Sequence, residues 1–124
     1  MNICITHSTN FNFSKELYEP LKNSDIYKNN NIFFPHDEEN KNINTQQIIR
    51  DSDLIISEVS YPSTGQGIEL GWANYLNKNI LCIYKKDQKF SLALKFITND
   101  FIEYENADDL INKLIFYIKD KYLN

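Results

Sequence analysis

The stretches Leu54-Ile55-Ile56-Ser57-Glu58-Val59 and Ile80-Leu81-Cys82-Ile83-Tyr84 indicate the fold class of this chain. Both place apolar residues at consecutive positions, as in a strand that helices cover on both faces of a sheet. Three further short apolar runs, at 3–6, 31–34 and 101–104, alternate with segments of helical pattern. This alternation is typical of a parallel sheet with crossover helices. We therefore expect an α/β protein in which the two quoted stretches are central strands.

Three segments, two between these runs and one after the last of them, carry helix signals. Ser14 is the expected cap of a first helix, in which Pro20 predicts a kink or a restart. Asn44-Thr45-Gln46-Gln47 resembles a capping box, with Gln47 reaching back, and predicts a helix from about 45 to 52. Asn106 is the expected cap of the last helix. The apolar face of that helix, expected in the core, comprises Leu110, Ile111, Leu114, Ile115 and Ile118.

Composition and charge narrow the class of protein. A chain of 124 residues, of which 42% are hydrophobic, predicts one domain over 1–124 with a core of its own. A net charge of −4 and a single arginine, Arg50, argue against a nucleic-acid partner, because nucleic-acid surfaces are basic. No apolar run reaches the roughly 20 residues of a membrane span, and the first residues lack the basic region of a signal peptide. We expect no membrane partner and a cytoplasmic location.

The two cysteines, Cys4 and Cys82, both fall in apolar, strand-like runs. A free buried thiol is commoner there than a disulfide, and two cysteines form no metal-ligand cluster. We expect reduced core cysteines and neither a metal nor an organic cofactor.

The loop after the third expected strand is the most unusual segment of the chain, because it and the helix that follows hold all three glycines. In an open parallel sheet, ligands bind beyond the carboxyl ends of the strands, where the strand order reverses. Gly65 and Gly67 permit a positive φ and a close approach of a ligand to the backbone. The amides of 63–67 lead into a helix N-terminus, where a polar ligand can bind. Gly71 is expected to let that helix pack tightly against the sheet.

Glu69 is expected in the first turn of the same helix, where the helix dipole and free amides favour an ionised carboxylate. This placement has two interpretations. Glu69 is either a stabilising first-turn acid, worth about 0.3–1 kcal/mol, or an anionic nucleophile. Spacing alone leaves both open.

The segment from Asp53 to Ser91 resembles the nucleoside 2-deoxyribosyltransferases and the related 2'-deoxynucleoside 5'-phosphate N-hydrolases. The shared elements are Asp53, Ser57-Glu58-Val59, Pro62-Ser63, Gly65-x-Gly67, Glu69-Leu70-Gly71-x-Ala73 and a strand such as 80–84. We expect a flavodoxin-like or Rossmann-like three-layer sandwich, with a five-stranded parallel sheet of order 2-1-3-4-5. Of the shared residues, Asp53 is expected to hold the geometry of its strand and loop.

The resemblance implies cleavage or transfer at the N-glycosidic bond of a (deoxy)nucleoside or nucleoside 5'-monophosphate. Glu69 would attack the anomeric carbon, the base would depart, and water or another base would resolve the glycosyl-enzyme intermediate. Ser63, the glycine-loop amides and Ser8 would contact sugar hydroxyls or a 5'-phosphate. Ser91 would reach the phosphate across a dimer interface. The implied partners are a small nucleoside or nucleotide and a second copy of the chain.

Two positions depart from the family pattern: Cys4 stands where an aromatic hydroxyl is common, and Thr45 where an Asp is common. His7 and His36 follow strands expected to be neighbours, and a histidine can protonate a departing base near neutral pH. Each is therefore a candidate catalytic acid, with Asp37 as the possible orienter of His36. The alternative for both is a surface or loop-anchoring histidine.

Aromatic residues near the glycine loop leave further alternatives open. Tyr61 and Trp72 can stack on a base or pack at a subunit interface. Trp72 and Tyr75 lie three apart and share a helix face that is able to join two subunits. A second possible function is a nucleotide-binding or sensing module that has lost turnover, and a third is a purely structural domain.

Overall fold

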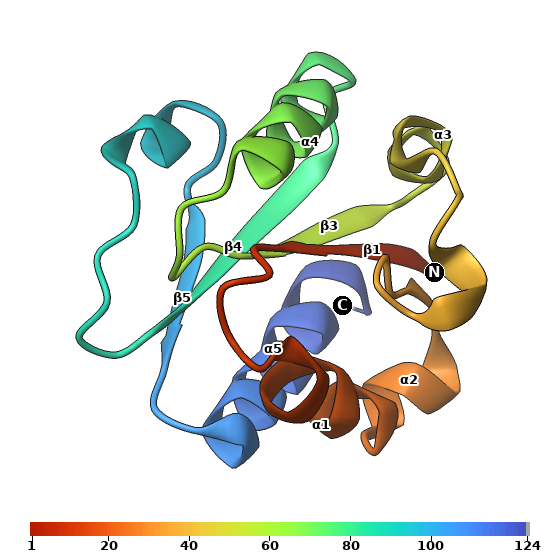
Figure 1. The fold of residues 1–124 in the computed structure, drawn as a ribbon. Coiled ribbons are helices and arrows are strands. Elements are labelled where there is room, and N and C mark those ends of the chain that lie inside the picture. The colour runs from red at the N-terminus through yellow and green to blue at the C-terminus, as the bar shows by residue number, and fades with distance from the viewer. Residues whose placement is uncertain (124) are drawn as a thin grey trace.

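The computed structural model describes residues 1–123. A five-stranded parallel sheet forms the centre of the fold (Figure 1). Its strands are β1 (Asn2–His7), β2 (Asn31–Phe33), β3 (Leu54–Glu58), β4 (Asn79–Lys85) and β5 (Asp100–Tyr104). They lie in the order β2-β1-β3-β4-β5, which confirms the predicted fold class and strand order. The central strand β3 is buried along its whole length, because helices cover both of its faces.

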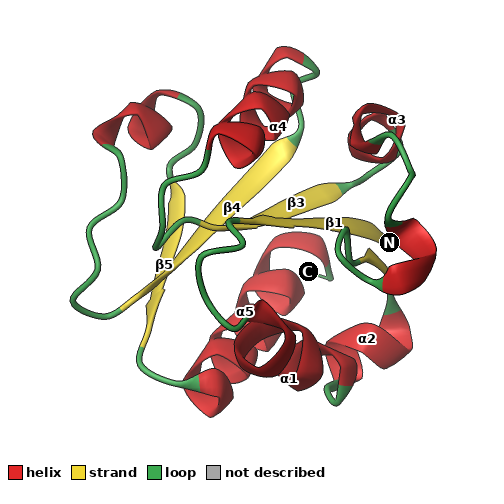
Figure 2. Cartoon of the chain, viewed as in Figure 1, coloured by secondary structure: helices red, strands yellow, loops and turns green. Residues whose placement is uncertain are grey.

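Helices form one layer on each face of the sheet, so the predicted three-layer sandwich is confirmed (Figure 2). One layer holds α3 (Thr45–Arg50), α4 (Thr64–Tyr75) and the short helix η3 (Leu92–Phe96). The other holds η1 (Ser14–Tyr18), α1 (Glu19–Lys22), α2 (Asp25–Asn29) and α5 (Ala107–Tyr122). The remaining helix, η2 (Glu38–Asn40), lies in the connection between β2 and α3.

Alternation along the strands sends neighbouring side chains into different cores. Ile3 and Ile5 of β1 join the core under α1 and α5, whereas Cys4 between them joins the core under α3 and α4. Successive residues of a strand point to opposite faces, so this alternation extends to the carboxyl end of β1. Thr6 therefore faces α4 and His7 faces the opposite layer.

The helix ends follow the sequence signals in part. The side chain of Asn106 accepts a hydrogen bond from the Asp109 amide at 2.9 Å and begins α5, as predicted. Asn44 likewise accepts from the Gln46 amide at 2.9 Å and begins α3. The predicted reach of Gln47 back to this cap is wrong, because its side-chain amide donates instead to Asp51 one turn further on.

The predicted role of Ser14 as the cap of the first helix is also wrong. Asn12 takes that role: its side-chain oxygen accepts from the Lys15 amide at 3.3 Å. The expected restart at Pro20 is confirmed, because the chain forms a single π-helical turn over η1 and becomes α-helical at Glu19. Proline has no N–H, so a change of hydrogen-bond pattern just before it leaves no donor unpaired.

The helix α4 begins at Thr64, directly after Ser63, which corrects three expectations about the glycine segment. Gly65 and Gly67 lie inside the helix, and none of the glycines in the described chain has a positive φ. Glu69 is therefore the sixth helical residue, in the second turn rather than the first. A Cβ added at Gly71 would have no heavy atom outside its own helix within 4 Å, so this glycine is not needed for close packing.

The described residues also bear on the expectations about cysteines, metal ions and membrane spans. Cys4 and Cys82 are both buried and free, as predicted. Over residues 1–123, no cluster of three or more His, Cys, Asp or Glu side chains is arranged to hold a metal ion. None of the helices described is long and apolar enough to cross a bilayer.

Candidate active site

The reversal of strand order places the candidate site beyond the carboxyl ends of β1 and β3. The crossover from β1 passes through α1 and the crossover from β3 passes through α4, on opposite faces of the sheet. Loops leaving the two strands therefore diverge and open a space between them, which is where ligands bind in sheets of this kind. Ser8, the loop 59–63 and the α4 helix all belong to this edge.

Glu69 is half-buried on α4 and lies beside α3. Its carboxylate interacts with the hydroxyl of Thr45, the first residue of α3. Burial raises the pKa of the Glu69 carboxyl, and the hydrogen bond with Thr45 opposes that rise. Burial and the Thr45 hydroxyl therefore set the pKa of Glu69, which lies beyond the first turn of the helix.

The two departures from the family pattern both lie near Glu69. Burial raises the pKa of the Cys4 thiol to about 12, and the nearby Glu69 carboxylate adds to that rise. Cys4 is therefore a neutral, apolar neighbour of the carboxylate, and Thr45 is a neutral hydroxyl neighbour. Neither residue supplies a second carboxylate next to Glu69.

The first turn of α4 is tied to the ends of two strands by Gln66. The side chain of Gln66 is buried, and its amide nitrogen donates to the Glu58 carbonyl at 2.6 Å and to the Ser57 hydroxyl at 2.8 Å. The same nitrogen lies 3.5 Å from the Thr6 carbonyl. Ser57 also accepts from the Thr6 hydroxyl at 2.7 Å. Sequence reasoning missed Gln66, because a glutamine at this helix position usually reads as a capping residue.

Four of the predicted binding residues, Tyr61, Ser63, Gly67 and Ser91, line one cleft of about 370 Å³ between α4 and η3. Apolar side chains form much of the remaining wall, including Val59, Leu70, Leu94 and Ile97. In Figure 1, α4 lies between α3 and the helical segment η3. The cleft lies on the η3 side of α4, whereas Glu69, which interacts with Thr45, lies on the α3 side. The structure thus brings these four predicted binding residues together and places Glu69 across the helix from them.

Gly65 and Gly67, which were predicted in a loop and lie inside α4, have open surroundings. A Cβ added at Gly65 or Gly67 would have no heavy atom outside its own helix within 4 Å. Ser63, the cap residue of α4, makes no capping hydrogen bond with its side chain. The hydroxyl of Ser63 is therefore free to contact a ligand in the cleft.

Ser8 and Tyr61 are each held by their own loops. Ser8 is buried, and its hydroxyl accepts from the Asn10 amide at 3.0 Å. The Tyr61 ring stacks on Phe11 with centroids 5.3 Å apart, and its hydroxyl accepts from Lys85 at 3.2 Å. Stacking of Phe11 on Tyr61 joins the loop after β1 to the loop after β3.

His7 is buried, and both of its ring nitrogens make hydrogen bonds. Its Nδ1 lies 2.7 Å from the Ser8 carbonyl, and its Nε2 lies 2.6 Å from the Tyr18 hydroxyl. A carbonyl only accepts, so Nδ1 carries the proton and Nε2 accepts from Tyr18. Burial lowers the pKa of His7 to about 4. His7 is therefore neutral near pH 7, with both ring nitrogens occupied.

His36 lies at the same edge and is exposed. Its backbone amide donates to the Tyr18 hydroxyl at 3.0 Å, and its ring lies 5.1 Å from the ring of His7. The expected pairing of His36 with Asp37 does not occur: both carboxylate oxygens of Asp37 accept from Lys22, at 2.8 and 2.9 Å. Lys22 stands 15 residues before Asp37 in the chain, so this pairing depends on tertiary packing and could not be read from the neighbouring sequence.

Glu58 is a second buried carboxylate at the end of β3, on the layer opposite α4. It accepts from the amide of Ser60 at 2.6 Å and from the hydroxyls of Ser60 and Tyr104. Burial raises the pKa of Glu58, and these hydrogen bonds oppose the rise. All the contacts of Glu58 are internal, so it holds the start of the loop 59–63.

Asp53, at the other end of β3, accepts from the Asn2 amide at 2.7 Å and is structural, as expected.

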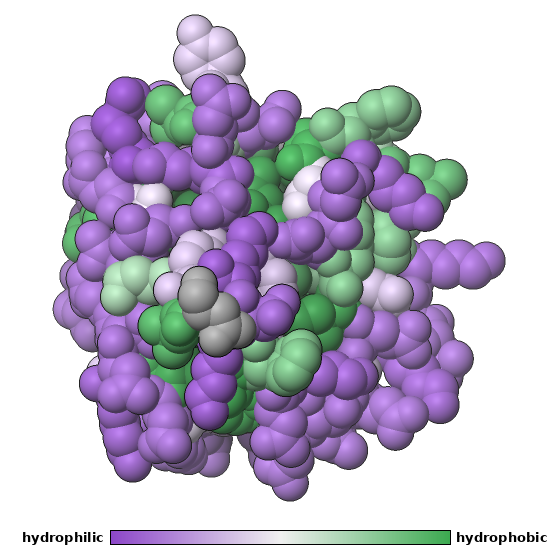
Figure 3. Space-filling view, turned by 180° about the vertical axis from the view of Figure 1, so that it is seen from behind, coloured by the Kyte–Doolittle hydropathy of each residue, from purple (hydrophilic) through white to green (hydrophobic). Residues whose placement is uncertain are grey.

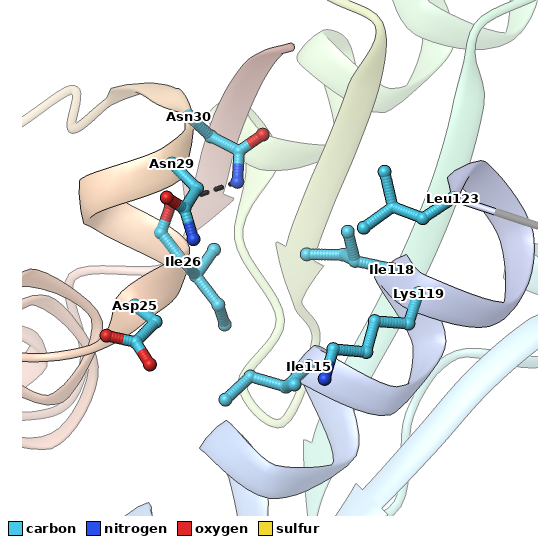
Figure 4. Close-up of a pocket in the computed structure, with 8 residues that line it drawn as sticks. All are labelled: Asp25, Ile26, Asn29, Asn30, Ile115, Ile118, Lys119 and Leu123. Carbon is cyan, nitrogen blue, oxygen red and sulfur yellow. Dashed lines mark hydrogen bonds between the residues drawn. The ribbon is translucent and has the colours of Figure 1, made fainter.

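A groove of about 230 Å³ between α2 and α5 lies at the opposite edge of the sheet (Figure 4). Ile26 of α2 faces Ile115 and Ile118 of α5 across it. The N-terminal amine donates to Asn30 beside this groove, which places it at the amino ends of the strands. Ligands of open parallel sheets bind at the other edge, so we exclude this groove as the substrate site.

Comparisons with known proteins bear on the family of the chain. No family model matches the chain. A 5-hydroxymethyl-dUMP N-hydrolase of Branchiostoma floridae is 35% identical over 74 residues, which cover 51% of this chain and 70% of that protein. A protein of the same name from Esox lucius is 48% identical over 42 residues, which cover 34% of this chain and 29% of that protein.

Two solved structures share the fold. A CMP N-glycosidase of Clostridium botulinum superposes with a TM-score of 0.73 at 18% identity, over 94% of this chain and 99% of that one. A 2-deoxyribosyltransferase of Leishmania mexicana superposes with a TM-score of 0.56 at 19% identity, over 98% of each chain. These relatives and neighbours are named as enzymes of N-glycosidic bonds. On the similarity to the Branchiostoma protein and on this fold, the chain belongs to the superfamily of nucleoside 2-deoxyribosyltransferases and deoxynucleotide N-hydrolases.

Proposed function

We propose that this protein cleaves or transfers at the N-glycosidic bond of a nucleoside 5'-monophosphate or nucleoside, with Glu69 as the nucleophile. The observation that carries the proposal is the position of Glu69, a half-buried carboxylate beside the switch point of the sheet in a chain of this superfamily. A carboxylate divides one difficult displacement into two easier ones through a covalent intermediate.

The reaction takes two steps. An ionised Glu69 oxygen forms a bond to the anomeric carbon while the bond from that carbon to the base nitrogen breaks, and the base leaves with the electron pair and takes up a proton. Water, or the nitrogen of a second base, then attacks the same carbon and loses a proton to the solvent, while the bond from that carbon to Glu69 breaks and releases the carboxylate. Hydrolysis gives a free sugar or sugar phosphate, and transfer gives a new nucleoside.

We assign the proton for the departing base to His36 rather than to His7. Both nitrogens of His7 are occupied, and burial lowers its pKa to about 4. The His36 ring is exposed at the same edge and packs against Phe13, 5.3 Å between centroids. His7 then acts on the site by fixing Tyr18 and, through Tyr18, the backbone at His36.

Because Glu69 lies across α4 from the cleft, the hydroxyls of Ser63 and Ser91 are the proposed contacts for a 5'-phosphate rather than for the reacting carbon of the sugar. Ser91 begins η3 and accepts from the Ala93 amide at 3.3 Å, so its hydroxyl proton is free to donate to a ligand. Tyr61 closes the cleft from the side of the β3 loop.

We also propose a homodimer that covers the outer surface of α4 and η3. Tyr75 is 86% exposed, Phe96 91% and Leu92 69%, which is unusual for large apolar side chains. Apolar side chains protrude at the upper right of Figure 3, the corner that η3 occupies when the view of Figure 1 is turned around. A second copy seated there brings its own α4 and Ser91 next to the cleft.

Incubation with a panel of nucleosides and their 5'-monophosphates, followed by chromatography for free base, tests the proposal directly. We expect free base from at least one member, and a larger rise in KM for the monophosphate than for the nucleoside when Ser63 is changed to Ala. Binding of panel members without any base release would contradict the proposal and favour a sensing module.

A further inference from the structure

We propose that Gln66 is a positioning residue for Glu69, which it places for attack by fixing the first turn of α4 to the carboxyl ends of β1 and β3. The inference rests on the proposed nucleophile and goes beyond it. Gln66 makes no contribution to the chemistry itself, and its effect on the rate passes through the position of the carboxylate.

The contacts of Gln66 reach three groups on two strands. Its amide nitrogen lies 2.6 Å from the Glu58 carbonyl, 2.8 Å from the Ser57 hydroxyl and 3.5 Å from the Thr6 carbonyl. Two of these acceptors belong to the end of β3 and one to the end of β1. A single side chain thus links the helix to both strands that border the switch point.

The geometry of α4 passes this constraint on to Glu69. Residues three apart on a helix are neighbours on one face, and Gln66 and Glu69 have that spacing. Leu70 and Ala73, one and two turns further on, pack into the core, but apolar contacts are non-directional and tolerate sliding. The hydrogen bonds of Gln66 are directional, so they set the height and rotation of the helix above the strand ends.

Other anchors at this end of α4 are scarce. The cap residue Ser63 makes no side-chain capping bond, and Gly65 and Gly67 have open surroundings. A first turn that is built from Gly65 and Gly67 has little side-chain contact of its own to hold it. Gln66 is 5% exposed and is the polar side chain of this turn that is buried.

A small misplacement of a reacting group is costly: about 1 Å can reduce a rate by about 10²-fold. Gln66→Met keeps the length and bulk of the side chain and removes its donors. We expect kcat to fall by about 10- to 100-fold. KM should stay within about threefold, because Met keeps the bulk of the buried Gln66 side chain at the wall of the cleft and the hydroxyls of Ser63 and Ser91 are unchanged. Gln47→Met is the matched control, since it makes the same replacement at an exposed helical position on α3 and should leave both constants unchanged.

The double variant with Glu69→Ala separates this proposal from the proposed function. If Gln66 acts through Glu69, adding Gln66→Met to Glu69→Ala causes no further loss of turnover. A further loss of tenfold or more, or a Gln66→Met variant with a parental kcat, overturns the positioning role. Substantial turnover by Glu69→Ala alone overturns the nucleophile instead, whatever Gln66→Met does.

Ser57→Ala provides a second route if Gln66→Met does not fold. It removes one of the two short contacts of Gln66 and leaves the bond to the Glu58 carbonyl. We expect a fall in kcat of about threefold or more in the same direction, without a change in KM. An unchanged kcat in a folded Ser57→Ala variant contradicts the proposal.

Discussion

The hydroxyl of Tyr18 lies 2.6 Å from Nε2 of His7 and 3.0 Å from the backbone nitrogen of His36. It donates to the imidazole and accepts from the amide, so one phenol links the loops that follow β1 and β2. Burial, which lowers the pKa of His7 to about 4, keeps the imidazole neutral, with the proton on Nδ1. The relationship changes His7 from a candidate acid into a residue that holds the site together.

Replacement of Glu69 by Ala should reduce turnover by about 10³-fold or more, because a covalent nucleophile has no substitute. The fold should persist, since Glu69 is only half-buried. Kinetics on an active substrate, with circular dichroism to check the fold, measure both effects. Turnover within about tenfold of the parent, a barrier difference of about 1.4 kcal/mol, would show that the assignment is wrong, and a glycosyl adduct found on Glu69 by mass spectrometry would support it.

Replacement of Thr45 by Val should shift the acid limb of the pH–rate profile to higher pH. The Thr45 hydroxyl lowers the pKa of Glu69 against the rise that burial causes. Removing it raises the pKa, and a reaction that needs the ionised carboxylate then reaches its plateau at a higher pH. Thr45→Ser keeps the hydroxyl and should behave like the parent. Identical profiles for Val and Ser variants would separate Thr45 from the tuning of Glu69.

His7 should make the protein less stable as pH falls from about 6.5 toward 4. Burial lowers the folded-state pKa of His7 from 6.5 to about 4, so in this window the unfolded chain binds a proton that the folded chain does not. The difference corresponds to a loss of about 3 kcal/mol of unfolding free energy from this residue.

Denaturant unfolding of the parent and of His7→Gln at several pH values measures this effect. Glu58 and Glu69 have raised pKa values, and their contributions are lost as pH rises, so the two slopes oppose one another. The difference between parent and variant isolates His7. Equal pH dependence in both proteins would contradict a neutral, buried His7.

The chain should sediment as a dimer at micromolar concentration, and Phe96→Asp should shift it toward the monomer. Phe96 is 91% exposed on η3, and a charge at that position opposes burial against a second copy. Phe116→Asp is the matched control, because Phe116 is 72% exposed on α5 in the opposite layer. A monomeric parent would remove the basis for any role of Ser91 across an interface.

The strands, the strand order and the resemblance to a family that acts on N-glycosidic bonds could all be predicted from the sequence. The consecutive apolar residues at 54–56 and 80–83 are typical of strands that are covered on both faces, and a sheet of such strands with helices between them has few topologies. The caps at Asn44 and Asn106 were also predictable, because a side chain that accepts from an amide two or three residues away is a local interaction.

Tertiary structure decided what surrounds each candidate residue. Asp37 accepts from Lys22 and does not pair with His36. The Tyr18 hydroxyl bonds to Nε2 of His7. The buried Gln66 side chain bonds to the end of β3 and approaches the end of β1. Each of these contacts joins segments whose relative position depends on the packing of two cores rather than on local sequence. Burial, which sets the direction of the pKa shifts of His7 and Glu69, likewise exists only once the layers have closed over the sheet.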